Sequence, residues 1–207
     1  MEGGISNAGE SRDRGEDTMK AAVLVIDMLN DFVTGKLGNE RVRSVIEPIR
    51  RLLERARASG VPVVYIGDAH LPSDPEMAVW GPHAMKGTKE AETIPELAPQ
   101  PGDTVLEKRT YSAFYETGLD LLLRSLGVET VVITGLHTNI CCRHTAADAF
   151  THGYKIIVPE DCVNAFTEEE HREGLAYLRR VYGARITTSE ELAREWEREP
   201  RTAATMA

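Results

Sequence analysis

A cysteine at the junction of a strand and a helix is the residue of this chain best suited to chemistry. Cys141 lies in TGLHTNICC, residues 134–142, where the apolar run VVIT breaks into a glycine turn and a helix begins. A thiol at the start of a helix faces the positive end of the helix dipole, which predicts a lowered pKa and a usable nucleophile. The alternative is a small buried apolar side chain, the more common role of a single cysteine.

Two charged residues that end predicted strands would supply partners for this thiol. Asp27 directly follows the apolar run AVLVI, and Lys108 ends the run VLEK. Amide hydrolysis needs a nucleophile, a carboxylate that takes its proton and passes it to the leaving amine, and a cation that favours thiolate. Taken singly, Asp27 could cap a turn and Lys108 could be solvated. The three residues together predict a hydrolytic site.

The long irregular segment 67–102 carries a second candidate site. Asp68 and His70 lie two residues apart at a strand end, and His83 can return to them from the loop. Two imidazoles and a carboxylate suit zinc, iron or manganese, although from spacing alone three ordinary polar loop residues are an equal alternative. Long irregular loops are usually functional. Two further carboxylates of the loop could complete a metal shell: Asp74 and Glu76.

The elements that must position these residues alternate along the chain. Amphipathic segments predict helices over residues 40–58, 117–126, 139–151, 168–182 and 189–199. Apolar, β-branched runs predict six strands, over residues 21–26, 61–66, 103–108, 128–134, 154–159 and 184–188. The pattern predicts an α/β fold, a three-layer sandwich with a central, mostly parallel, Rossmann-like sheet of six strands. In such sheets ligands bind beyond the carboxyl ends of the strands, where the candidate residues lie.

Length and composition favour one domain and a reducing compartment. We expect a single domain over residues 19–199, a disordered tail over 1–18 and a loose tail over 200–207. The net charge of −9 argues against nucleic acid and acidic membrane surfaces as partners. The chain has neither an apolar stretch of about 20 residues nor the apolar core of a signal peptide. Its three cysteines do not form a disulfide framework, which predicts a cytoplasmic protein.

Three motifs in a fixed order resemble a known family. Asp27 lies in V-I-D-x-x-x-D-F, Lys108 precedes YSAF, and Cys141 ends G-L-H-T-N-I-C. This order, over roughly residues 20–190, resembles the isochorismatase-like cysteine hydrolases, the superfamily of nicotinamidases and N-carbamoylsarcosine amidases. The resemblance implies that Cys141 is the nucleophile, Asp27 the general base and acid, and Lys108 the third member of a triad.

The same resemblance implies an oxyanion hole and a metal site. A non-proline cis peptide between Leu136 and His137 would aim the backbone N–H groups of His137 and Cys141 at the oxyanion. The pattern D-x-H followed by W-x-x-H-x-x-x-G-T is similar to that of nicotinamidases, in which an aspartate and two histidines hold a metal that takes the pyridine nitrogen of the substrate. The metal ligands implied here are Asp68, His70 and His83.

Aromatic residues would wall the substrate pocket. By the resemblance these are Phe32, Trp80 and Tyr111, and an aromatic box suits a flat heteroaromatic amide. Ordinary packing is the alternative for Phe32, as it is for Phe114. Cys142 replaces the valine usual in the family and, like Cys162, is predicted to be buried packing.

The combined prediction is a metal-containing cysteine amidohydrolase that converts a small primary amide, foremost nicotinamide, into its acid and ammonia through a thioester. The predicted cofactor is a divalent metal, zinc first with iron or manganese as alternatives, and the resemblance implies a homo-oligomer. GPHAMKGT and HTNICC depart from nicotinamidase-like motifs, which keeps N-carbamoyl or ureido amidases open. An isochorismatase proper, which does not need the cysteine, and a silent binding or scaffold homologue are the remaining alternatives.

Overall fold

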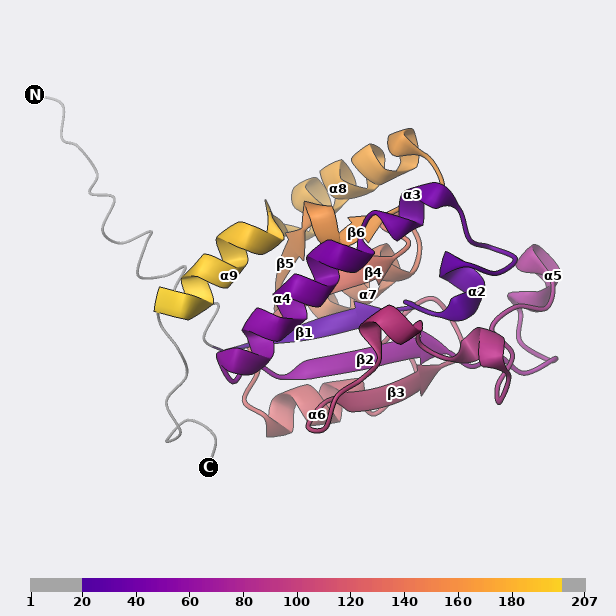
Figure 1. Ribbon diagram of the computed structural model, residues 1–207, viewed down its shortest axis with the longest axis horizontal. Helices are drawn as coiled ribbons and strands as arrows, with labels where there is room; N and C mark the ends of the chain where they lie inside the picture. Colours follow the sequence, from indigo (N-terminus) through magenta and orange to yellow (C-terminus); the bar gives the residue numbers. More distant parts are fainter. Residues whose placement is uncertain (1–19, 199–207) are drawn as a thin grey trace, which may run out of the picture.

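One parallel sheet organises the described part of the chain, residues 20–198 of a computed structural model (Figure 1). The predicted tails, residues 1–18 and 200–207, lie outside this range, as do residues 19 and 199 of the predicted domain. The sheet order is β3-β2-β1-β4-β5-β7, with β6 paired to β4, and every pairing is parallel. The strands are β1 (Ala21–Ile26), β2 (Val63–Asp68), β3 (Thr104–Lys108), β4 (Thr130–Leu136), β5 (Lys155–Pro159), β6 (Val163–Asn164) and β7 (Arg185–Thr187).

The predicted α/β sandwich is therefore confirmed, with two corrections to its strands. A seventh strand, the two-residue β6, was not predicted, because so short a strand has no periodicity to detect. Both β2 and β4 begin and end two residues later than the apolar runs indicate. Asp68 consequently closes β2 instead of following it, and Gly135 and Leu136 belong to the ladder of β4.

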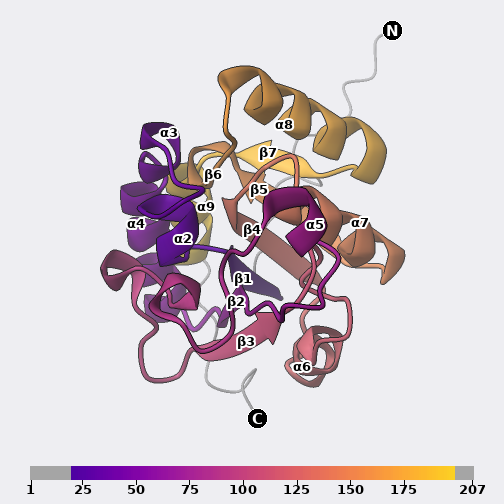
Figure 2. The ribbon, with the colours of Figure 1, turned by 90° about the vertical axis from the view of Figure 1, so that its right-hand side faces the viewer.

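Helices cover both faces of the sheet (Figure 2). None of those described between residues 20 and 198 is long and apolar enough to cross a membrane. The segment predicted as one helix over 40–58 is divided in two, α3 and α4. The α-helices are α2 (Asn30–Val33), α3 (Glu40–Arg43), α4 (Ile46–Ala58), α5 (Met77–Trp80), α6 (Leu119–Ser125), α7 (Cys141–Thr151), α8 (Glu168–Tyr182) and α9 (Ser189–Arg198), and short 3₁₀ turns are η1 (Lys89–Ala91), η2 (Pro95–Leu97) and η3 (Glu160–Cys162).

The alternation of side chains along β1 separates two hydrophobic cores. All six residues of β1 are buried, as expected for a parallel strand covered on both faces. Ala21, Val23 and Val25 face the core that α4 and α9 close, whereas the residues between them face the core of α6, α7 and α8. The central strand is thus fixed in register, because a shift by one residue would exchange its two faces.

A crevice opens where the chain reverses its direction across the sheet. From β1 the chain builds β2 and β3 on one side and then returns to place β4 on the other side. Connections leaving β1 and β4 therefore diverge at their carboxyl ends, the usual ligand site of such sheets. Gly135 allows the close approach there: its φ is 103°, and a Cβ would lie 1.9 Å from the carbonyl oxygen of Ile26.

Helix α8 has well-defined ends. Thr167 and Glu170 form a capping box, in which the Thr167 side chain accepts from the Glu170 N–H and the Glu170 carboxylate accepts from the Thr167 N–H. At its other end the helix stops at Gly183, whose φ of 64° is left-handed.

Candidate active site

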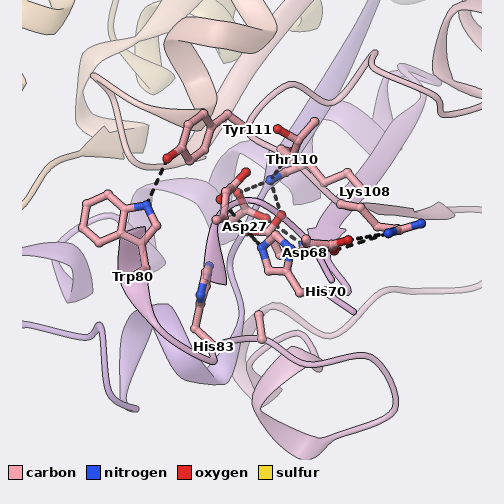
Figure 3. Close-up of polar contacts among 12 residues, drawn as sticks. Asp27, Asp68, His70, Trp80, His83, Lys108, Thr110 and Tyr111 are labelled. Atoms are coloured by element: carbon pink, nitrogen blue, oxygen red, sulfur yellow. Dashed lines mark hydrogen bonds and ion pairs between the residues drawn. The ribbon is translucent and has the colours of Figure 1, made fainter. Parts of the chain in front are cut away.

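A buried cluster of ion-paired side chains lies at the carboxyl ends of three neighbouring strands, β1, β2 and β3 (Figure 3). Asp68 and Lys108 are register partners on β2 and β3, and Asp27 follows the last residue of β1. The Lys108 Nζ lies 2.8 Å from Asp27 Oδ2 and 2.6 Å from Asp68 Oδ1. The Asp68 N–H also donates to Asp27 Oδ1 at 2.9 Å. All three side chains are at most 2% exposed, so their charges are balanced mainly by one another.

Cys141 joins this cluster from the first residue of α7. Its thiol lies beside the Asp27 carboxyl group. The Cys141 Sγ and a carboxylate oxygen from each of Asp27 and Asp68 lie within 4.8 Å of one another. The structure thus brings together the three residues that the sequence predicts as a triad, and it adds Asp68 as a second partner of Lys108.

The three charged residues of the ion-pair cluster have pKa values that are shifted in different directions. Burial would lower the pKa of Lys108, but Asp27 and Asp68 outweigh it and hold that pKa well above its usual value. Burial would likewise raise the pKa of Asp68, but Lys108 and His70 hold it below its usual value. Burial, together with the charge of Asp68, raises the pKa of Asp27 to about 7. Lys108 and Asp68 therefore stay ionised, and Asp27 is the group poised to exchange a proton.

The expectation of a lowered pKa for Cys141 is wrong. Burial raises the pKa of the thiol well above its usual value, and the charges of Asp27 and Asp68 oppose the favourable charge of Lys108. The helix dipole acts through the adjacent chain alone, whereas two carboxylates come from the ends of other strands. The thiol is therefore protonated near pH 7, and Asp27 is the neighbouring group that can accept its proton.

Three backbone N–H groups of the turn after β4 have no hydrogen-bond acceptor in the described chain. The peptide between Leu136 and His137 is cis, as the resemblance implies. Three N–H groups of the turn are bonded: those of Thr138 to Asn164 O, and of Ile140 and Cys142 to His137 O. Within the described chain, the N–H groups of His137, Asn139 and Cys141 have no acceptor. Those of His137 and Cys141 are the two donors predicted to form an oxyanion hole.

A second cluster, the donor cluster, gathers beside the triad: Asp68, His70, Glu76 and His83. Each offers one ligand atom, and these atoms lie within 4.8 Å of one another. His70 and His83 lie close together because the backbone at His70 pairs with the segment that follows His83. The His70 N–H donates to Ala84 O, and the Lys86 N–H donates to His70 O. The sequence offered two further carboxylates for this site, Asp74 and Glu76. Glu76 belongs to the donor cluster, whereas Asp74 contacts the far side of the His70 ring, at Nδ1.

The donor cluster fits a divalent cation. His70 Nδ1 lies 3.2 Å from Asp74 Oδ2, and His83 Nδ1 lies 2.8 Å from Gly81 O, which leaves both Nε2 atoms free to ligate. His70 Nε2 and Glu76 Oε1 are buried without a hydrogen-bond partner in the described chain. Two carboxylates and two imidazoles with unpartnered donor atoms suit zinc or a similar ion.

A narrow pocket connects the thiol to the donor cluster. Its cavity volume is about 20 Å³. Trp80 donates through Nε1 to the Tyr111 hydroxyl at 3.0 Å and stacks on Phe166 at 6.1 Å between centroids. The lining residues are Phe32, Leu37, Asp68, Glu76, Trp80, His83, Tyr111, His137, Ile140, Cys141 and Phe166.

The pocket contains all three aromatic residues predicted from the resemblance and two rings that the sequence did not reveal. Phe166 follows the unpredicted strand β6, and the His137 side chain stacks on it at 4.1 Å. Burial lowers the pKa of His137 to about 4, so its ring is neutral near pH 7. Phe114 packs instead against His152 and Tyr154, away from this pocket.

The remaining cysteines are packing residues. Cys142 and Cys162 are both 0% exposed, and neither forms a disulfide. This agrees with their predicted role in the core.

Comparisons with known proteins identify the family of the chain. The Isochorismatase domain family matches residues 21–191. The chain belongs to the isochorismatase domain family. Nicotinamidase 3 of Arabidopsis thaliana is 34% identical, over 82% of this chain and 85% of that protein.

Two solved structures of family members share the fold. N-carbamoylsarcosine amidase from Thermoplasma acidophilum is 47% identical, with a TM-score of 0.79 over 83% of this chain and 97% of that one. Pyrazinamidase of Pyrococcus horikoshii in complex with zinc is 26% identical, with a TM-score of 0.76 over 82% and 99%. The chain is therefore a hydrolase of this family, whose members include nicotinamidases and N-carbamoylsarcosine amidases.

The raised pKa of Asp27 predicts the acid limb of activity for this family member. Below about pH 7 Asp27 is mostly protonated and cannot accept the thiol proton, so kcat/KM should fall tenfold per pH unit as the pH decreases. Profiles of kcat/KM from about pH 5 to pH 9 measure this limb. A profile that stays flat from about pH 5 to pH 7 would contradict the assignment of Asp27 as the base.

Divalent metal should stabilise the folded family member. An ion at 100 times its dissociation constant adds about 2.7 kcal/mol if it binds only the folded state, so zinc should raise the thermal unfolding midpoint and a chelator should reverse the rise. His83→Ala removes one donor and should lose most of that rise, together with metal retained through dialysis. His152→Ala, at the opposite end of α7 from Cys141, is the control. Equal rises in both variants would place the ion elsewhere.

Proposed function

We propose that the chain hydrolyses nicotinamide to nicotinate and ammonia with zinc bound at the donor cluster. The observation that carries this proposal is that three residues of the donor cluster, Asp68, Glu76 and His83, line the same aromatic-walled pocket as Cys141. A pyridine carboxamide has the matching chemistry: a flat ring, a ring nitrogen that can bind a metal, and an amide carbon for the thiol. A bound zinc ion would supply Lewis acidity that holds the ring nitrogen.

The reaction then follows from the chain's own groups. Asp27 accepts the thiol proton while the Cys141 sulfur bonds to the amide carbon, and the oxyanion accepts hydrogen bonds from the His137 and Cys141 N–H groups. Asp27 returns the proton to the amide nitrogen, the C–N bond breaks, ammonia leaves and a thioester remains. Water then attacks the thioester, giving one proton to Asp27, which passes it back to the departing sulfur. Lys108 keeps its positive charge throughout and orients both carboxylates.

The charge of the pocket supports a neutral substrate. Two carboxylates, Asp68 and Glu76, contribute to the lining, and no lysine or arginine does so in the described chain. A substrate carboxylate would therefore meet like charges unless the metal accepted it. Nicotinamide carries no such charge, whereas N-carbamoylsarcosine and isochorismate do.

An N-carbamoyl amidase is the second candidate, because the Thermoplasma acidophilum structure has 47% sequence identity. Release of ammonia from nicotinamide, N-carbamoylsarcosine and benzamide by the zinc-loaded protein separates the candidates. We expect kcat/KM for nicotinamide to exceed that for each of the other two by at least about tenfold, since benzamide lacks the ring nitrogen and N-carbamoylsarcosine is an anion. Faster turnover of N-carbamoylsarcosine would replace the first proposal by the second.

The proposal includes a cytoplasmic location and association of several copies. Three free cysteines support a reducing compartment, and association is implied by the family resemblance. Light scattering of the purified protein measures its assembly.

A further inference from the structure

Helix α8 packs against the turn that carries the His137 and Cys141 N–H groups. Thr138, the residue after His137, is 0% exposed. Its Oγ1 lies 2.9 Å from Nδ1 of His171, on the second turn of α8. On the other side its backbone N–H donates to Asn164 O at 2.9 Å. The turn is therefore attached once through its backbone to β6 and once through a side chain to α8.

A glycine lets α8 approach the turn closely enough for this contact. Gly174 lies three residues after His171, on the same face of the helix. A Cβ at Gly174 would lie 3.0 Å from Thr138 Cγ2 and 3.3 Å from Asn139 N. The helix face that carries His171 and Gly174 thus packs closely against the turn after β4.

The His171 ring is suited to accept the Thr138 hydroxyl proton. Burial lowers its pKa, so the half-buried ring is neutral near pH 7. A neutral imidazole has one nitrogen without a proton, and a hydroxyl can donate to it. Within residues 20–198, the Thr138 hydroxyl has no other hydrogen-bond partner. Loss of the ring would leave a buried hydroxyl unsatisfied beside the catalytic turn.

We propose that His171 is a positioning residue of the hydrolysis: through the Thr138 hydroxyl it orients the His137 N–H toward the oxyanion. The inference rests on the proposed function, because amide hydrolysis by a thiol passes through a tetrahedral oxyanion. Donors of an oxyanion hole act only when they lie about 2.7–3.1 Å from that oxygen. His171 touches neither substrate nor thiol, so its removal should weaken binding of the transition state and leave substrate binding intact.

Substitution of His171 by alanine in the full-length zinc-loaded protein tests this role. We expect kcat on nicotinamide to fall roughly ten- to hundredfold, with KM changed by less than about twofold. Pyridine-3-carbaldehyde supplies a readout without turnover: the Cys141 sulfur adds to its carbonyl carbon and the thiol proton moves to the oxygen. Affinity for this aldehyde should weaken by the same factor as kcat. Affinity for nicotinate and the rate of Cys141 alkylation by iodoacetamide should stay within about twofold.

Companion variants test whether His171 acts through Thr138. His171→Asn places an amide near the position of Nδ1 and should restore most of kcat. Thr138→Val keeps the shape of the buried side chain and removes its hydroxyl, so it should reproduce the loss. In the double variant of His171→Ala and Thr138→Val, the loss should equal that of either single variant, because both remove one interaction. His152→Ala, which lies outside this contact, should behave as the unsubstituted protein.

Three results would overturn the proposal: unchanged kcat and aldehyde affinity in both His171→Ala and Thr138→Val, additive losses in the double variant, or a rise in KM at constant kcat. If His171→Ala does not fold, His171→Asn and Thr138→Val still decide between these outcomes. If the unsubstituted protein hydrolyses no amide in the panel, the proposed function fails by itself. The aldehyde and alkylation measurements then still judge the positioning role separately.

Discussion

Replacing Cys141 by alanine should lower kcat on any amide that the protein hydrolyses by roughly 10⁵- to 10⁶-fold, the scale on which removal of a hydrolase nucleophile acts. Without the sulfur no thioester can form, and the remaining oxyanion donors and pocket supply only residual catalysis. Ammonia release under substrate saturation measures the loss. Rapid quenching and mass spectrometry of the unsubstituted protein should also show the acyl group on Cys141.

Cys142 provides a matched control because it is the next residue of the same helix and is fully buried. Cys142→Ala removes a thiol of the same size from the core and should keep activity within about fivefold, with a modest loss of stability. Activity that survived in Cys141→Ala, or that was lost equally in both variants, would remove Cys141 from the mechanism.

Replacing Lys108 by methionine should both inactivate and destabilise the protein. The substitution keeps most of the side-chain volume but leaves Asp27 and Asp68 buried without their shared cation. Removal of one partner from a buried ion pair costs about 3–5 kcal/mol of unfolding free energy. Urea unfolding of both proteins at about pH 8, where Asp27 of the unsubstituted protein is ionised, should show the loss.

Because Lys108 lowers the pKa of Asp27, the substitution should raise that pKa further above 7. The loss should therefore shrink as the pH falls toward about 7, since Asp27 then takes up a proton in the variant before it does so in the unsubstituted protein. Lys86→Met is the control. Lys86 pairs with Glu107 on the surface, where the two side chains are 54% and 57% exposed, and such a pair contributes at most about 1 kcal/mol. Equal destabilisation by the two substitutions would contradict the role of Lys108 as the cation of a buried cluster.

The sequence was a good guide to which residues meet at the site. Asp27, Lys108 and Cys141 each follow or end an apolar run, and parallel strands place such positions at one edge of a sheet. Glu76 was harder to distinguish from Asp74, because both are carboxylates of one irregular loop. Only the fold of that loop sets Glu76 beside His83 and places Asp74 behind His70, where it is also hydrogen-bonded to Arg109.

Long-range contacts explain what the sequence did not reveal. Phe166 follows a two-residue strand that has no periodicity, and His171 faces the catalytic turn across 33 positions of sequence. The raised pKa of Cys141 has the same origin, since burial and carboxylates from β1 and β2 reverse a prediction based on the adjacent helix alone.

The sequence by itself predicted the alternation of six strands with helices, the family resemblance and the three residues of the proposed triad, because these depend on residue types and local periodicity. Only the tertiary structure decided the direction of the pKa shifts of Asp27 and Cys141, the presence of Glu76 in the donor cluster and the contact between His171 and Thr138. The physical reason is that charge, burial and ligand geometry depend on distances between side chains from separate elements. The strand order β3-β2-β1-β4 sets those distances at the crevice.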